Sequence, residues 1–266
     1  MTSTPVTPTA PTGASGSTPA ATTAARAARR RAVERRGLEQ ILVGALGLVA
    51  AIGLWFWGIL VVLQVGIGIV LPRVLDDEEA GIQISAGPVG PVQVFLFVMG
   101  IVTAAGLLTV HVAAGGTRRS AWRGWLLAAP VVGVSFAVVG LGVTALSRAV
   151  ATASGPDGAS LPGAFEAAVP TACGLAILGT TAYLTGIAVN VTYRRLGGGL
   201  GTLALPLVGA PVILAHVVLM GGGSGDGGVG DVPGVATSVV GWAAAVGCAV
   251  VAGVLVALVV RRTPIA

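Results

Sequence analysis

The chain contains no lysine and few charges of any kind. All fifteen of its basic residues are arginine, and only 9% of the 266 residues are charged. Without lysine, the phosphate-binding loop G-x-x-x-x-G-K-[ST] cannot form, and neither can a Schiff base to a lysine side chain. We therefore expect that the chain does not hydrolyse ATP by a P-loop mechanism.

Cysteine and aromatic residues are also scarce. The two cysteines, Cys173 and Cys248, both lie inside apolar runs. We predict that they are small buried side chains and form neither a disulfide nor a metal site. No spacing of cysteine and histidine resembles a zinc site, and no Ser/His/Asp or paired-carboxylate arrangement is visible. We expect no catalytic residue, no metal and no cofactor, and hence no enzyme.

Long apolar runs are what the chain has in abundance. Its residues are 55% hydrophobic and include 42 glycines, and the mean hydropathy is +0.93. Soluble domains have about 25% charged residues, so this composition predicts an all-α, polytopic bundle of membrane helices. Each run can supply the roughly 20 residues of helix that cross a bilayer core. The six predicted spans are 41–71, 92–114, 125–147, 167–191, 202–220 and 235–260.

The segment before the first span divides into two parts. Residues 1–25 are rich in Thr, Pro, Ala and Ser and have no charge, which predicts a disordered tail. Residues 26–40 carry six arginines. This basic segment is interpreted either as an interfacial helix on anionic headgroups or as a simple topology anchor. We expect Pro72 to end the first span.

The arginines are distributed unevenly about the predicted spans. Two of them, Arg73 and Arg148, lie in the three loops that also contain eight of the ten acids. The other thirteen lie in segments 1–40, 115–124, 192–201 and 261–266. The positive-inside rule therefore places both termini and the 115–124 turn in the cytoplasm. The abundance of Ala, Gly, Val and Arg suggests a bacterial genome, so we expect a multi-pass protein of the bacterial plasma membrane.

Few polar side chains fall inside the spans. His216 follows Pro211 by five residues, and both Pro206 and Pro211 are predicted to kink the fifth span. His216 is either a neutral histidine bonded to a backbone carbonyl or threonine, or a substrate or proton contact in a broken helix. The first interpretation is favoured because no neighbouring span carries a carboxylate.

Three further polar residues have simpler interpretations. Gln64 lies in the outer part of the first span and is predicted to hydrogen-bond across helices. His111 and Asn190 are close to the predicted cytoplasmic ends of their spans, so both are expected at the membrane interface.

Small residues recur at four-residue spacing within the later spans. Such pairs let helix backbones approach closely, either within the bundle or between subunits. The pairs are Gly133/Ala137, Ala182/Gly186, Gly241/Ala245 and Ala249/Gly253.

The basic turn from Gly115 to Gly124 is the best candidate for contact with a partner. It could serve topology alone, with three arginines that hold a loop on one side of the membrane. It could also form a short surface helix in which arginines bind carboxylates and Trp122 fills a groove. The candidate docking residues are Gly116, Thr117, Arg118, Arg119, Ser120, Trp122 and Arg123.

The layout resembles the six-span permease subunits of exporter-type ABC transporters. In these, an amphipathic helix precedes the first span, and a G-x-T/S-R-type stretch follows the second. The matching residues here are Arg29 to Glu39 and Gly116-Thr117-Arg118-Arg119-Ser120. The glycine-rich turn from Tyr193 to Leu203 is also similar to that of actinobacterial membrane proteins often described as such permeases.

The resemblance implies a coupling helix that contacts a separate cytoplasmic P-loop ATPase. It also implies two membrane subunits, identical or different, that form a transport path. No nucleic acid is expected as a partner. The alternative hypothesis, from another class, is a non-transporting membrane scaffold that recruits partners through its basic tail and loops.

Overall fold

The computed structural model describes residues 19–75, 89–154, 164–220 and 239–262, and these residues form helices joined by one described turn. No strand occurs within these ranges. Five helices are long and apolar enough to cross a membrane, which agrees with an all-helical, multi-pass membrane protein. They are α1 (Pro19–Leu75), α3 (Val89–Ala113), α4 (Arg118–Ser154), α5 (Ala164–Met220) and α6 (Val239–Arg262).

Helix α1 is longer than predicted at both ends. It begins at Pro19, so the prediction of disorder is wrong for residues 19–25, and residues 1–18 lie outside the described ranges. The early residues are rich in alanine, the strongest helix former, and proline fits the first turn of a helix. The basic segment 26–40 is therefore part of a continuous helix. At the other end, α1 continues past Pro72 to Leu75.

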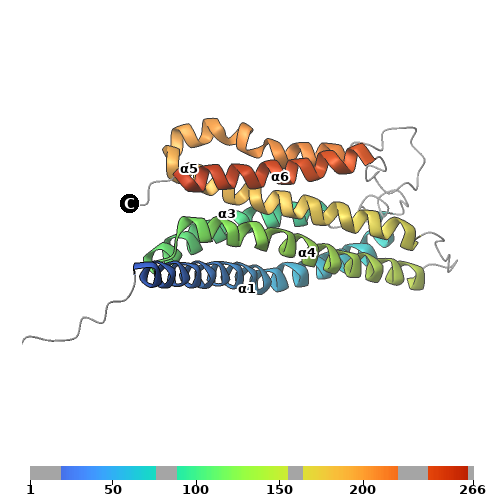
Figure 1. Cartoon of the computed structure of the whole chain (residues 1–266). Coiled ribbons are helices and arrows are strands. Elements are labelled where there is room, and N and C mark those ends of the chain that lie inside the picture. Colours follow the sequence, from blue (N-terminus) through green and yellow to red (C-terminus); the bar gives the residue numbers. More distant parts are fainter. Residues whose placement is uncertain (1–18, 76–88, 155–163, 221–238, 263–266) are drawn as a thin grey trace, which may run out of the picture.

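Helix α5 contains both the fourth and the fifth predicted spans. Its backbone is non-helical at Gly197, where φ is 75°. Figure 1 shows the chain turning back there, from the yellow arm to the orange arm. We call residues 164–196 the first arm and residues 198–220 the second arm. The break lies at Gly197, which glycine tolerates because it lacks a Cβ atom, whereas Pro206 and Pro211 keep helical backbone angles.

The first arm of α5 lies at the centre of the bundle. Every residue from 181 to 189 is buried. Helices α3, α4 and α6 each pack against α5, whereas α1 packs mainly against α4 (Figure 1). The main hydrophobic core therefore surrounds one helical segment.

Glycines mark the closest contacts of this central arm. A Cβ atom placed on Gly186 would overlap the carbonyl oxygen of Phe97 in α3 and would lie 3.1 Å from the Cα atom of Gly100. A Cβ atom on Gly133 of α4 would lie 2.5 Å from the carbonyl oxygen of Ala176. The predicted close packing at Gly133 and Gly186 therefore occurs inside the bundle, as expected for small residues at helix crossings.

Aromatic side chains join α1 to its neighbours on its inner face. Phe56 stacks on Phe95 of α3 with a centroid separation of 4.2 Å, and Phe95 in turn stacks on Phe136 of α4 at 5.4 Å. Such offset ring pairs add about 0.5–1.5 kcal/mol beyond the apolar area that they bury.

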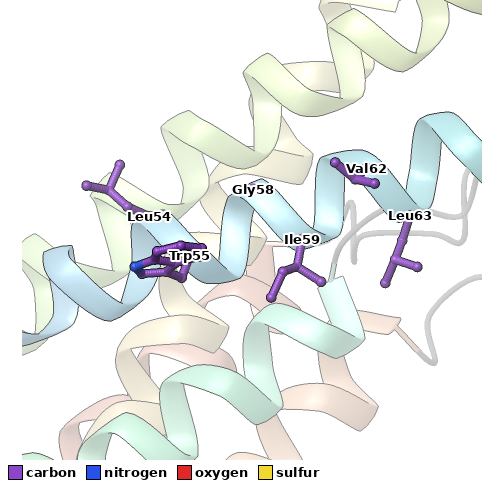
Figure 2. Close-up of a pocket in the computed structure, with 6 residues that line it drawn as sticks. All are labelled: Leu54, Trp55, Gly58, Ile59, Val62 and Leu63. Atoms are coloured by element: carbon purple, nitrogen blue, oxygen red, sulfur yellow. The ribbon is translucent and has the colours of Figure 1, made fainter.

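The opposite face of α1 carries large apolar side chains that no other described helix covers. Figure 2 shows these side chains projecting from α1 on both sides of Gly58. Trp55 is the most exposed of them. Such a surface is suited to contact with lipid chains, which are as apolar as the side chains themselves. The residues of this surface are Leu54, Trp55, Gly58, Ile59, Val62 and Leu63.

Candidate functional site

One end of the bundle gathers the arginines. Figure 1 places the start of α1, the α3–α4 turn, the bend of α5 and the end of α6 together. Every arginine whose side chain the structure describes belongs to these segments. We call this the arginine-rich end; its described members are Arg29, Arg31, Arg35, Arg36, Arg118, Arg119, Arg123, Arg194, Arg195 and Arg261.

The α3–α4 turn at this end is short and fully hydrogen-bonded. Gly115 has φ 82°, its N–H donates to the carbonyl of Val112 at 2.9 Å, and the Gly116 N–H donates to the carbonyl of His111 at 2.8 Å. This is the Schellman pattern that ends a helix. Thr117 then caps α4, because its Oγ1 accepts from the Ser120 N–H at 3.1 Å. The predicted coupling segment is therefore the first turn of α4 and not a separate helix.

His111 is buried in the junction behind this turn, in the last turn of α3. It is 4% exposed and Ser120 is 3% exposed. His111 Nε2 lies 2.9 Å from Ser120 Oγ and 3.3 Å from the carbonyl oxygen of Thr117. A carbonyl only accepts, so Nε2 carries the proton. A Cβ atom on Gly116 would overlap the imidazole ring, and one on Gly37 of α1 would lie 2.9 Å from Ser120 Oγ.

The candidate docking residues therefore divide into two groups. Arg119 and Thr117 are exposed, and Arg118 is half-buried. Ser120 is buried and faces His111. Trp122 is half-buried, and its ring lies 5.7 Å from the guanidinium carbon of Arg123 and 5.2 Å from that of Arg261. These cation–π contacts are within the chain. Arg118 and Arg119 are thus the members best placed for an outside partner.

Arg194 fastens the bend of α5 to α3. Its guanidinium donates to the Ala105 carbonyl at 2.6 Å and to Thr109 Oγ1 at 3.1 Å. Tyr193, beside it, pairs its hydroxyl with Thr202 Oγ1 at 3.1 Å across the bend. The bend is therefore anchored by side chains on both of its sides.

The polar contact of His216 involves a residue that sequence reasoning overlooked. His216 Nδ1 donates to Gln93 Oε1 at 2.8 Å, which joins the second arm of α5 to α3. The partner is a side-chain amide, not the backbone carbonyl or threonine that we expected. The sequence signal that could have identified Gln93 is a single amide side chain within an apolar run. Gln64 belongs to α1, but its side chain is outside the described part of the structure.

Asn190 has an incomplete set of hydrogen bonds. It is half-buried near the arginine-rich end, and its Oδ1 has no hydrogen-bond partner among the described residues.

Metal and disulfide chemistry have no visible site in the described ranges. No group of three or more His, Cys, Asp or Glu side chains that could hold a metal occurs there. Cys173 and Cys248 are both free. The expectation that both are buried is wrong, because Cys173 is exposed and Cys248 is only partly buried.

Comparisons of the chain with protein-family models, with curated proteins and with solved structures gave no match. Functional inference for this chain therefore depends on its own residues and their arrangement.

Proposed function

We propose that the chain is the integral membrane subunit of an ABC-type exporter and that a separate subunit hydrolyses the ATP. The observation that carries this proposal is the basic turn of the arginine-rich end. Thr117 caps the start of α4 and so fixes Arg118 and Arg119 on an ordered helical turn. Guanidinium groups held in this way can form bidentate contacts with carboxylates of a soluble partner.

The topology supports the same proposal. If each arm of α5 crosses the membrane once, the proposed topology has six spans, an even number that would bring the start of α1 and the end of α6 to one side. Under the positive-inside rule, the arginine-rich end faces the cytoplasm of a bacterial cell, where an ATPase subunit would meet it.

The packing of α5 bears on where a transport path would run. Residues 181–189 of the first arm are all buried, and the arm meets α3 and α4 at glycine contacts. A path through the centre of one copy would have to separate these contacts. We therefore place the path between two membrane subunits, either two copies of this chain or this chain and a related one.

A non-transporting membrane scaffold is the second candidate. This alternative is favoured because several residues of the turn make contacts within the chain. Ser120 is hydrogen-bonded to His111, and Trp122 lies between two arginines of the same chain. In this alternative, the arginine-rich end would attract partners through its charge, without a specific docking surface.

Co-purification can distinguish the two candidates. The tagged full chain is extracted from its native membrane in detergent, captured, and its partners are identified by mass spectrometry. We expect a stoichiometric P-loop ATPase with the wild type and a loss of about 10-fold with the double variant Arg118→Ala/Arg119→Ala, as for contacts at the centre of an interface.

The matched control is Arg36→Ala/Arg195→Ala, which removes the same charge from exposed positions at the same end. It should retain the ATPase. An equal loss in the control would indicate general charge attraction and favour the scaffold. A wild-type chain that captures no ATPase would refute the exporter proposal.

A further inference from the structure

A hollow of about 280 Å³ opens at the arginine-rich end between α1 and α4. It combines residues that are about ninety positions apart in the chain, so no local sequence pattern predicts it. Its lining residues are Arg31, Glu34, Arg35 and Leu38 from α1, and Ser120 and Arg123 from α4.

The lining is cationic and rich in hydrogen-bond donors. Three arginines and one glutamate line it, and Arg31 and Arg35 are one helical turn apart and exposed. The Ser120 hydroxyl already donates to the Thr117 carbonyl at 2.7 Å. The charged donors of the hollow are the guanidinium groups, whose fork geometry matches the oxygens of a phosphate.

The position of the hollow indicates where that phosphate comes from. Leu38 and the neighbouring Ile41 begin the apolar part of α1, and Arg31 lies only about 15 Å farther along the helix at 1.5 Å per residue. On α4, Arg123 comes two residues before the buried Trp125. Headgroup regions extend roughly 5–8 Å beyond the hydrocarbon core, and long arginine side chains can reach back to them. The hollow thus has an apolar side toward the membrane and a cationic rim away from it.

We propose that this hollow binds the headgroup of an anionic glycerophospholipid with a hydroxylated headgroup, such as phosphatidylglycerol. The arginines Arg31, Arg35 and Arg123 bind the phosphate oxygens, and Leu38 contacts the start of an acyl chain. The Glu34 carboxylate accepts a hydrogen bond from a headgroup hydroxyl. This role requires both the arginines and the Glu34 carboxylate, whereas a basic segment that only sets membrane topology requires the arginines alone.

The lipid site stands apart from the exporter proposal. Its test changes Arg31 and Arg35, whereas the docking test changes Arg118 and Arg119. Failure of either proposal therefore leaves the other intact.

Native mass spectrometry of the full chain in a neutral detergent can measure this binding. Phosphatidylglycerol and phosphatidylcholine are titrated separately. We expect the wild type to bind phosphatidylglycerol about 10-fold more tightly, and Arg31→Gln/Arg35→Gln to lose about 10-fold or more of that affinity. The matched control, Arg29→Gln/Arg36→Gln, removes two arginines of the same helix that do not line the hollow and should stay within about 3-fold of the wild type.

Three results would overturn the proposal: equal losses in the two double variants, equal binding of both lipids by the wild type, or displacement of the lipid by inorganic phosphate, which would indicate a soluble anion. Circular dichroism and gel filtration check that each variant is folded. Should Arg31→Gln/Arg35→Gln fail to fold, the single change Arg123→Gln on α4 decides the matter, and unchanged affinity in that variant would refute the site.

Discussion

The two arms of α5 are similarly apolar but occupy opposite environments. In the first arm, every residue from 181 to 189 is buried. In the second arm, Leu203 is 78% exposed and Leu207 is 73% exposed. The small residues Ala182 and Gly186 lie inside beside larger side chains such as Ile187, whereas these two leucines of the second arm lie outside. In a bilayer, lipid chains are as apolar as leucine, so side-chain size and packing decide which segment becomes central.

The arms also differ in how they are held. The first arm is enclosed by helix crossings at Gly179 and Gly186. The second arm shares a small buried cluster with Leu178 and α6, and it is tied to α3 by the His216–Gln93 hydrogen bond. Substitutions that affect one arm and spare the other therefore test the comparison.

The largest expected effect is that of an added methyl group at the central crossing. Gly186→Ala would place a carbon atom against the Phe97 carbonyl oxygen, with backbone on both sides of the contact. We expect the free energy of unfolding to fall by about 3 kcal/mol, the upper part of the range for overpacking. The measurement is unfolding by a denaturing detergent, followed by circular dichroism.

Gly209→Ala is the matched change in the second arm, where no atom lies within 4 Å of the added methyl. It should leave stability unchanged or raise it by about 0.4–1 kcal/mol. Similar losses in both variants would mean that the arms are equally packed.

The next effect comes from removing a large side chain from each arm. Ile187 of the first arm is fully buried in the main core, so Ile187→Ala leaves a cavity and should cost about 2 kcal/mol. Leu207→Ala exchanges one lipid-facing apolar surface for another and should change the free energy of unfolding by less than about 0.5 kcal/mol. The same titration measures both. A larger loss for Leu207→Ala would show that a partner or a second copy covers the second arm.

The smallest effect concerns the bend that separates the arms. Gly197 has φ 75°, so Gly197→Ala should cost about 1–2 kcal/mol from the left-handed backbone alone. Gly198→Ala, one residue later, meets no atom within 4 Å and needs no positive φ, and it should be neutral. The difference in detergent midpoint between the two variants isolates the bend. Equal midpoints would show that the return of the second arm does not depend on Gly197.

The helices themselves could largely be predicted from the apolar runs. The second predicted span, 92–114, differs from α3 by only a few residues. The third, 125–147, is shorter than α4 at both ends, because a helix does not stop where its apolar stretch meets the membrane surface. The same reason explains α1, whose alanine-rich start continues the helix well beyond the hydrocarbon.

The contacts between helices could not be predicted in the same way. Both the lipid side and the core side of these helices are apolar, so hydropathy does not tell the inner face from the outer one. Gln93 and His216 are 123 positions apart, and nothing local relates them. The exposure of Arg119 followed from its charge, but the burial of Ser120 depends on His111 across the turn.

The hydrogen-bonded α3–α4 turn also has a mechanical consequence. Only four residues, 114–117, connect two long helices, and the N–H groups of Ala114, Gly115 and Gly116 are all bonded to α3 carbonyls. Thr117 fixes the first turn of α4 in the same way. These bonds hold the end of α3 and the start of α4 in a fixed relative geometry at the turn. The other joint at this end of the bundle, the Gly197 bend, has non-helical angles at a single residue and is held by the side chains of Arg194 and Tyr193.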